Sequence, residues 1–136
     1  MSNLETVQAI YDAFGQGNVP AILDRLDETV EGERPGVGHG VPWLKPGQGK
    51  AHVGQFFASL AAIDISKFVP VNLLAGGNQV VAVIDIELTV KATGQAVRDE
   101  ELHLWTFGPD GKVSSFHHVV DTAQHVAAYR GQLVSA

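Results

Sequence analysis

Five ionisable side chains in the second half of the chain have types and spacings suited to acid–base chemistry. Asp85 and Glu87 are two residues apart, as are Glu101 and His103, and His118 lies in a later apolar stretch. Residues two apart on a β-strand point to the same side of a sheet. We therefore expect these five side chains to line one side of a sheet built from three neighbouring strands.

Imidazole is the side chain best matched to proton transfer near neutral pH, because its unperturbed pKa is about 6.5. A neighbouring carboxylate favours the charged imidazolium, whereas burial favours the neutral ring. Our hypothesis is that His118 or His103, oriented by Glu101 or Asp85, abstracts or returns a proton. The substrate would be an apolar molecule that carries a carbonyl group.

Two other interpretations of the same residues stay open. A histidine between strands often only hydrogen-bonds a carboxylate, and Asp85, Glu87 and Glu101 can form a solvated sheet face. Glu101, His103 and His118 also have the types of three metal ligands with an open position, but their spacing matches no ligand motif. We accordingly predict no metal and no cofactor.

A pocket for an apolar ligand also needs a wall, which aromatic residues elsewhere in the chain can supply. Trp43 lies in a segment rich in Gly and Pro, so it suits either packing or a lid over a pocket mouth. The remaining histidines, His39, His52 and His125, are predicted to be exposed. The residues predicted to contact the ligand are Tyr11, Trp43, Phe56, Glu87, Trp105 and Phe116.

Helical periodicity places three helices in the first half and one at the end. Ser2 to Glu5 is a capping box before apolar residues at helical spacing, and Asn18 can cap a second, short helix. Residues 50–62 return to helical spacing after a predicted short strand at 29–34 and a loop at 35–49. Asp121 can cap the last helix.

From Ile63 onward the apolar pattern alternates, which predicts strands. The predicted strands cover residues 64–74, 79–91, 96–107 and 112–120. Turn residues between them, including Gly76-Gly77-Asn78 and Pro109-Asp110-Gly111, favour antiparallel hairpins. Helices followed by hairpins predict an α+β fold in which helices close one side of a curved sheet and leave a pocket.

Composition narrows the classes of protein. The 136 residues fit one domain, predicted to span 1–136, and 45% of them are hydrophobic. A net charge of −6 with nine scattered Lys and Arg argues against nucleic-acid binding, and the absence of Cys excludes disulfides and thiolate chemistry. No apolar run is long enough to span a membrane, so a cytoplasmic location is the default expectation.

Several stretches resemble the SnoaL-like branch of the NTF2-like superfamily. They are residues 11–23, Val41-Pro42-Trp43, residues 49–60 with Phe56-Phe57, and Asp110 to Val113 followed by residues 116–123. The resemblance implies a cone-shaped fold with N-terminal helices on the concave face of a curved antiparallel sheet. It also implies a homodimer through the sheet, for which Ile84, Ile86, Leu88, Leu102 and Leu104 are the predicted apolar face.

The superfamily includes ketosteroid isomerases, limonene-epoxide hydrolases, polyketide cyclases and proteins that only bind, so the fold does not name the reaction. The resemblance to epoxide hydrolases places a pair of catalytic positions near Asp85 and Glu87 and puts His118 where they carry an aspartate. Their paired arginine is not matched, so epoxide hydrolysis is not predicted. The functions considered are a cofactor-free isomerase, cyclase or hydratase, a noncatalytic domain that binds a small apolar molecule, and an assembly module.

Overall fold

The computed structural model describes residues 1–32 and 40–131. Its strands are β1 (Leu26–Glu31), β2 (Ile63–Gly76), β3 (Gln79–Val90), β4 (Ala96–Phe107) and β5 (Val113–Val119). Its α-helices are α1 (Asn3–Gly15), α2 (Val19–Leu23), α3 (Lys50–Ser59) and α4 (Thr122–Tyr129), and short 3₁₀ helices are η1 (Pro42–Leu44) and η2 (Leu60–Ala62). The prediction of an α+β fold is confirmed.

Helices α1, α2 and α4 begin where side chains accept hydrogen bonds from free backbone N–H groups, whereas α3 begins at Gly49 without a side-chain cap. Ser2 and Glu5 form the predicted capping box of α1, Asn18 caps α2, and the Asp121 carboxylate accepts a hydrogen bond from the backbone N–H of Gln124 at the start of α4. Within residues 1–32 and 40–131, no helix is long and apolar enough to cross a membrane.

The five strands form one sheet in the order β1-β5-β4-β3-β2. Strands β2 to β5 are paired as antiparallel hairpins, as predicted, and Gly77 at the β2–β3 turn has a φ of 57° that favours glycine. Strand β1 differs from its prediction, because it begins three residues earlier and pairs parallel to β5. Residues 33 and 34 of the predicted strand and residues 35–39 of the predicted loop lie outside the described residues.

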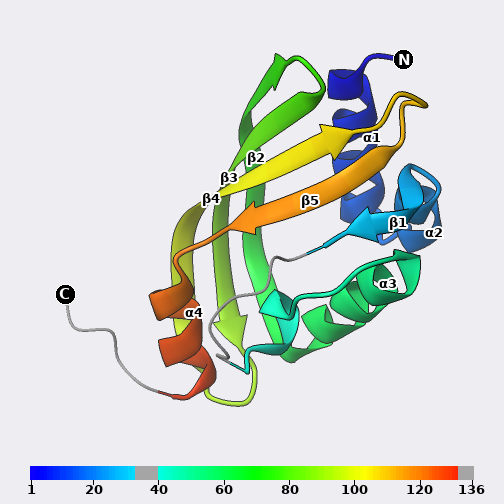
Figure 1. The fold of residues 1–136 in the computed structure, drawn as a ribbon. Helices are drawn as coiled ribbons and strands as arrows, with labels where there is room; N and C mark the ends of the chain where they lie inside the picture. The colour runs from blue at the N-terminus through cyan, green and yellow to red at the C-terminus, as the bar shows by residue number, and fades with distance from the viewer. Residues whose placement is uncertain (33–39, 132–136) are drawn as a thin grey trace.

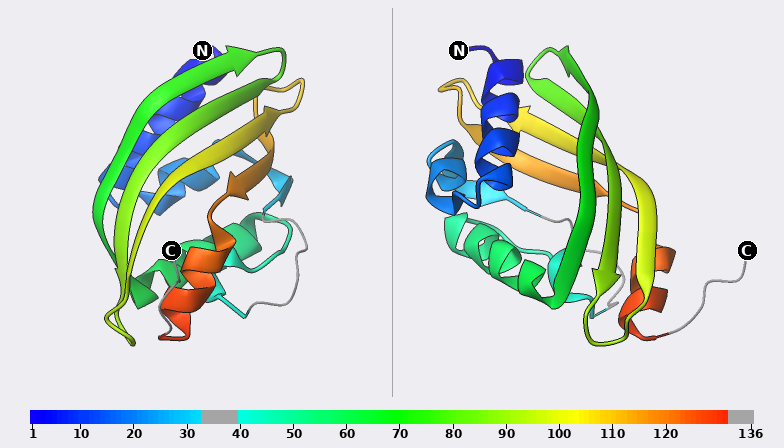
Figure 2. Two further views of the ribbon diagram at one scale, coloured as in Figure 1. Left: turned by 90° about the vertical axis from the view of Figure 1, so that its left-hand side faces the viewer. Right: turned by 180° about the vertical axis from the view of Figure 1, so that it is seen from behind.

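The sheet curves around a concave side that the helices cover. Helices α1 and α3 lie across this side, and α4 closes one end of it against β3 and β4 (Figures 1 and 2). The hydrophobic core lies between the sheet and these helices, with Ile84 and Val97 from the sheet and Val7 from α1 fully buried. The sheet thus forms the wall of a closed-ended cone.

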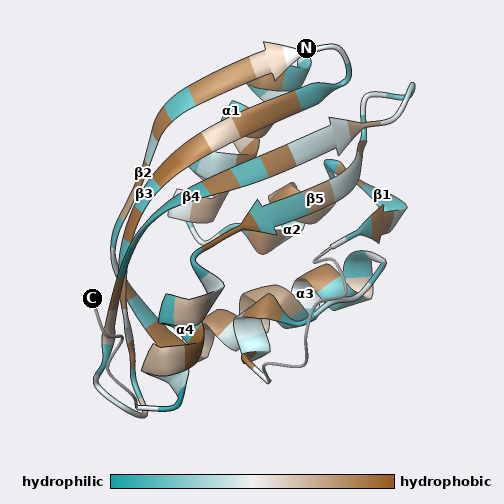
Figure 3. Cartoon of the chain, turned by 60° about the vertical axis from the view of Figure 1, so that its left-hand side comes forward, coloured by the Kyte–Doolittle hydropathy of each residue, from teal (hydrophilic) through white to brown (hydrophobic). Residues whose placement is uncertain are grey.

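The pairing of strands divides the predicted apolar sheet face between two sides. Ile84 lies opposite Glu101 in the β3–β4 pair, so Ile84, Ile86 and Leu88 face the concave core. Leu102 and Leu104 point to the convex side, where Leu102 is exposed. The prediction that these residues form one exposed face is therefore wrong. Along the strands, hydrophobic and hydrophilic residues occur in mixed order (Figure 3).

Candidate functional site

A cavity of about 110 Å³ lies inside the cone, between the concave face of the sheet and the helices. Its lining is mostly aliphatic and aromatic, with a few ionisable groups gathered from β4, β5 and α4. Of the residues predicted from the sequence, those that line it are Tyr11, Trp43, Phe56, Glu101, His103, Trp105, Phe116 and His118. These eight residues come from five different elements.

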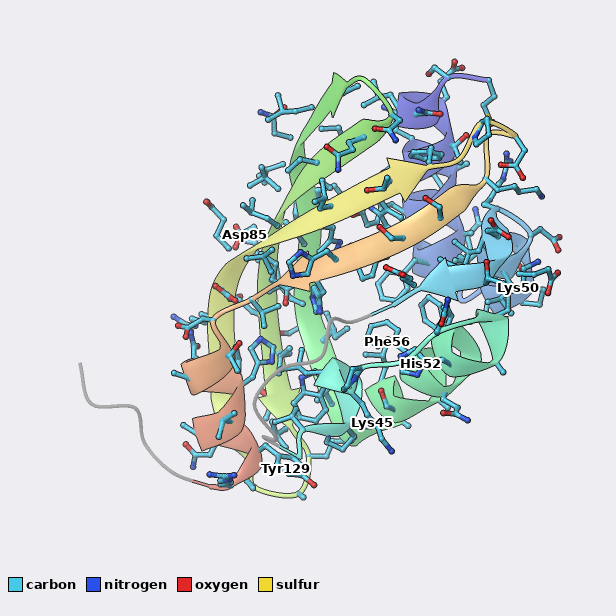
Figure 4. All side chains as sticks on the ribbon, viewed as in Figure 1. Lys45, Lys50, His52, Phe56, Asp85 and Tyr129 are labelled. Atoms are coloured by element: carbon cyan, nitrogen blue, oxygen red, sulfur yellow. The ribbon has the colours of Figure 1, made fainter. Side chains whose placement is uncertain are left out.

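The prediction that Asp85 and Glu87 share the concave face is wrong. Both point to the convex side, where Asp85 contacts Lys67 at 2.7 Å and Glu87 contacts Arg98 at 3.2 Å. The physical reason is the pairing register, which puts the even-numbered residues of β3 on the same side as Glu101. Figure 4 shows Asp85 on the outer side of the sheet, away from Phe56.

Glu101 is the centre of the polar cluster. One of its oxygens, Oε2, lies 3.0 Å from His103 Nε2 and 2.9 Å from His118 Nε2, and the residue is 2% exposed. Burial alone would raise the pKa of Glu101, but the hydrogen bonds from the two histidines outweigh it and hold that pKa below its ordinary value. Glu101 is thus an ionised carboxylate in an apolar interior.

A chain of hydrogen bonds continues from His103 to the aromatic residues. Trp105 Nε1 donates to the Tyr11 hydroxyl at 3.0 Å, and that oxygen lies 2.7 Å from His103 Nδ1. Burial raises the pKa of Tyr11, which keeps its hydroxyl protonated. Because an indole N–H only donates, we assign the Tyr11 proton to His103 Nδ1 and the His103 proton to Nε2, facing Glu101.

The same assignment gives His118 its proton on Nε2, so its lone pair lies on Nδ1 when the ring is neutral. Burial lowers the pKa of His103 to about 4, despite the opposing effect of its bond to Glu101, and keeps that ring neutral. The carboxylate oxygen Glu101 Oε2 therefore accepts a hydrogen bond from each of the two imidazoles.

His125 is a member of the site that the sequence prediction missed. It was predicted to be exposed, yet it is 1% exposed, and its Nδ1 accepts a hydrogen bond from Trp43 Nε1 at 2.9 Å. A weak signal existed in the sequence, since His125 precedes buried Ala128 by three residues on α4 and so shares its helix face. His52 lines the cavity and is partly buried, and His39 lies outside the described residues.

Phe68 also lines the cavity, although the strand pattern of residues 64–74 does not distinguish it from its neighbours. Its ring centroid lies 5.9 Å from that of Tyr11, 5.0 Å from that of Phe14 and 6.2 Å from that of His103. It therefore helps to enclose the polar cluster. Alternation within β2 alone does not reveal this, since bulges shift the register of that strand.

The donor atoms of Glu101, His103 and His118 lie close enough together to hold a metal ion. A metal would need the lone pairs of both Nε2 atoms, whereas the assigned network places a proton on each of them. The hydrogen bonds thus give each of these three groups a partner without an ion. The absence of a metal remains a prediction.

Comparison with known proteins places the chain in a family. The model of the SnoaL-like domain matches residues 7–116, so the chain belongs to the SnoaL-like domain family. No curated protein matches it.

Solved structures with the NTF2-like fold agree with this assignment. An NTF2-like protein of unknown function from Burkholderia pseudomallei is 22% identical over 95% of this chain and 98% of its own, with a TM-score of 0.82. TerC, co-crystallised with polyporic acid, is 22% identical over 94% and 98%, with a TM-score of 0.79. A proposed polyketide cyclase from Pseudomonas putida is 20% identical over 94% and 98%, with a TM-score of 0.73. These likenesses confirm the predicted NTF2-like fold.

Proposed function

We propose that this chain is a cofactor-free acid–base catalyst in which His118 moves a proton on a small apolar molecule that carries a carbonyl group. The observation that carries the proposal is the pairing of His118 Nε2 with ionised Glu101 inside the cavity. The carboxylate orients the ring so that Nδ1 is the basic nitrogen, and it stabilises the imidazolium that forms when the ring takes a proton. The reaction class would be that of an isomerase, a cyclase or a hydratase.

In this proposal His103 and Tyr11 have a supporting role. His103 uses Nε2 toward Glu101 and Nδ1 toward Tyr11, so both of its nitrogens are engaged within the fold. It holds the Glu101 carboxylate in position, and the Tyr11–Trp105 pair holds His103. Asp85 has no part in the proposal, because it lies on the convex side.

The cavity supports an apolar ligand of modest size. Its wall includes Trp105, Phe116 and Phe56. The Phe56 ring contacts His118, and the Phe116 ring contacts both His103 and Trp105. An apolar cavity of about 150 Å³ holds benzene. The volume of about 110 Å³ here is somewhat smaller, which limits the expected ligand to about one small ring. TerC, which has the same fold, was crystallised with polyporic acid, and the similar Pseudomonas putida structure is a proposed polyketide cyclase.

The proposal is tested by the exchange of α-protons of cyclohexanone for solvent deuterium, followed by NMR. We expect the chain to accelerate exchange and His118→Ala to slow it by about 10²- to 10⁴-fold, the usual contribution of a general base. His117→Ala is the matched control, because His117 is adjacent on β5 but pairs with Leu104 on the other face. Equal exchange rates for the chain and for His118→Ala would remove the proposal.

A noncatalytic binding domain is the second candidate, and one observation favours it. Hydrogen bonds link Trp105 to Tyr11, Tyr11 to His103 and His103 to Glu101, so these groups bind one another. Such a chain is what we expect of a rigid polar wall that only orients a ligand. Binding of cyclohexanone without any exchange above the background rate would support this function. The cavity itself favours either pocket function over an assembly module, for which a filled cone is expected.

We also propose that the chain forms a homodimer through the convex side of the sheet. Exposed large apolar side chains gather there on β2, β4 and β5, and a patch of this kind typically marks an interface. The residues of this convex patch are Val69, Val71, Leu74, Leu102 and Val119. They replace the set predicted from the sequence, three members of which are buried in the core.

A further inference from the structure

Trp43 determines which nitrogen of His125 carries a proton. The indole N–H of Trp43 can only donate, and it points at His125 Nδ1 across 2.9 Å. His125 Nδ1 must therefore carry a lone pair, which excludes the imidazolium and places the single proton on Nε2. Trp43 is itself 2% exposed, so the arrangement is held rigidly in the core.

The proton on His125 Nε2 is buried, with no acceptor in place, on a residue that lines the cavity. Among residues 1–32 and 40–131, no hydrogen bond reaches this buried nitrogen. The nearest charged atom is Glu101 Oε1, 3.9 Å away, which is too far for a hydrogen bond. A buried donor without an acceptor is costly, so this position calls for a group that the protein itself does not supply.

Glu101 Oε1 is an acceptor 3.9 Å from this donor, on another residue that lines the cavity. Both hydrogen bonds from His103 and His118 go to the other oxygen, Oε2. A single oxygen atom placed about 2.8 Å from both His125 Nε2 and Glu101 Oε1 would span the 3.9 Å between them. That oxygen must accept from the imidazole and donate to the carboxylate, and a hydroxyl group does both.

We propose that His125 and Glu101 together form a two-point binding site for a hydroxyl group of the ligand. The site rests on the proposed function, because it deepens the substrate class from a carbonyl-bearing molecule to one that also carries a hydroxyl. Glu101 then has two roles on its two oxygens: Oε2 orients His118, and Oε1 accepts the hydroxyl proton. Trp43 acts as a positioning residue that fixes the His125 tautomer.

Three one-ring probes separate the two halves of this site. Phenol donates and accepts, anisole only accepts, and toluene does neither. A cavity without the pair would prefer toluene, because a polar group loses its water on entry. We expect calorimetric titration at pH 7 to show phenol binding about 10- to 100-fold more tightly than toluene, with anisole between them, since hydrogen bonds to charged groups have this net value.

Variants at His125 then test whether the preference for phenol over toluene depends on the N–H of this residue. His125→Phe keeps a ring but removes the donor, and we expect it to abolish the preference for phenol. His125→Gln keeps an N–H and should retain part of it, which also guards against a result caused by poor folding of His125→Phe. Trp43→Phe leaves His125 in place but frees its tautomer, so the preference should fall to an intermediate value.

Several results would overturn the site. Equal binding of phenol and toluene would remove it, as would a full preference for phenol in His125→Phe. Anisole cannot donate a hydrogen bond, so binding of anisole as tight as that of phenol would show that Glu101 Oε1 does not accept the hydroxyl proton. A crystal structure with phenol that shows water between His125 and Glu101, and the phenol oxygen elsewhere, would reassign the position to water.

The selectivity is measured without turnover, so its outcome is independent of the exchange assay. A preference for phenol with no deuterium exchange would leave the hydroxyl site standing and reject the catalytic proposal. Exchange catalysed by His118 with no preference for phenol would do the reverse.

Discussion

The two faces of the sheet place carboxylates of similar sequence context in different environments, one buried and one exposed to water. On the concave face Glu101 is 2% exposed and receives hydrogen bonds from two buried histidines. On the convex face Asp85 lies 2.7 Å from Lys67, and both side chains are 44% exposed. The adjacent strands β4 and β3 thus carry one buried carboxylate placed for acid–base chemistry and one that forms only an exposed ion pair.

The difference shows that the environment of a carboxylate, rather than its residue type, decides how much its interactions stabilise the fold. An exposed ion pair is screened by water and salt, and it contributes little because two mobile side chains must be held together. Inside the cone the effective dielectric is lower, so each hydrogen bond to Glu101 is stronger and its loss leaves a buried donor unsatisfied. Four predictions test this comparison.

The largest expected effect is that of Glu101→Ala, which leaves the Nε2 protons of His103 and His118 buried without an acceptor. We expect it to lower the free energy of unfolding by about 3 kcal/mol, measured by urea denaturation at pH 7. The matched variant on the convex face is Asp85→Ala, for which we expect a change near zero. Equal losses for the two variants would contradict the comparison.

Acidification is expected to destabilise the protein, because buried histidines on the concave side resist protonation. Burial lowers the pKa of His103 from 6.5 to about 4, and burial also lowers that of His125. Between pH 6.5 and 4 the unfolded chain therefore binds protons that the folded chain does not, so stability is complete above pH 6.5 and is lost as the pH falls toward 4.

The measurement is the urea midpoint at pH 7, 6 and 5, which should fall steadily. His103→Gln removes one of the titrating groups and should make the fall shallower, whereas Lys67→Gln on the convex face should leave it unchanged. A midpoint that does not vary between pH 7 and pH 5 would show that the buried histidines titrate normally.

A smaller effect is expected from Tyr11→Phe. The change leaves Trp105 Nε1 without its acceptor and His103 Nδ1 without its donor, at a cost of about 2 kcal/mol in the free energy of unfolding. Tyr129→Phe is the control, since Tyr129 is 37% exposed and contacts Trp43 through its ring. Thermal unfolding followed by circular dichroism compares the two, and similar melting temperatures would contradict the hydrogen-bond assignment.

The smallest effect on stability, but a clear one on assembly, is expected from Leu74→Lys on the convex patch. A charge in the proposed interface should convert a dimer to a monomer in light scattering after size-exclusion chromatography, with little change in the fold. Gln55→Lys, on an exposed position of α3, is the control and should remain dimeric. If the unaltered chain is a monomer, the proposed homodimer is wrong.

Local patterns in the sequence predicted the secondary structure apart from the bounds of β1, and eight of the ten predicted site residues line the cavity. Capping residues predicted the starts of α1, α2 and α4, and alternation predicted that Glu101, His103 and Trp105 share a face. The Ser2–Glu5 box and the strand alternation work because they depend on neighbours within a few residues. Alternation also placed His118 on the same face as Phe116, two residues before it on β5, and both line the cavity.

The errors have a common physical origin. Alternation states which residues of one strand share a face, but it does not state which face is inside, nor how adjacent strands are aligned. The pairing of Ile84 with Glu101 decided that Asp85 and Glu87 point outward, and this pairing depends on hydrophobic burial across the whole sheet. Which residues of β3 point into the cone is therefore set by the tertiary structure.

The amino-acid sequence by itself thus determined the elements, their order and the residues that each strand presents together, because these follow from short-range sterics and hydrogen bonding. The tertiary structure alone decided that Trp43 of η1 contacts His125 of α4, 82 positions later in the chain, and that His125 lies 3.9 Å from Glu101. Contacts of that kind follow from the closing of the sheet and helices around a common core, which no local pattern encodes.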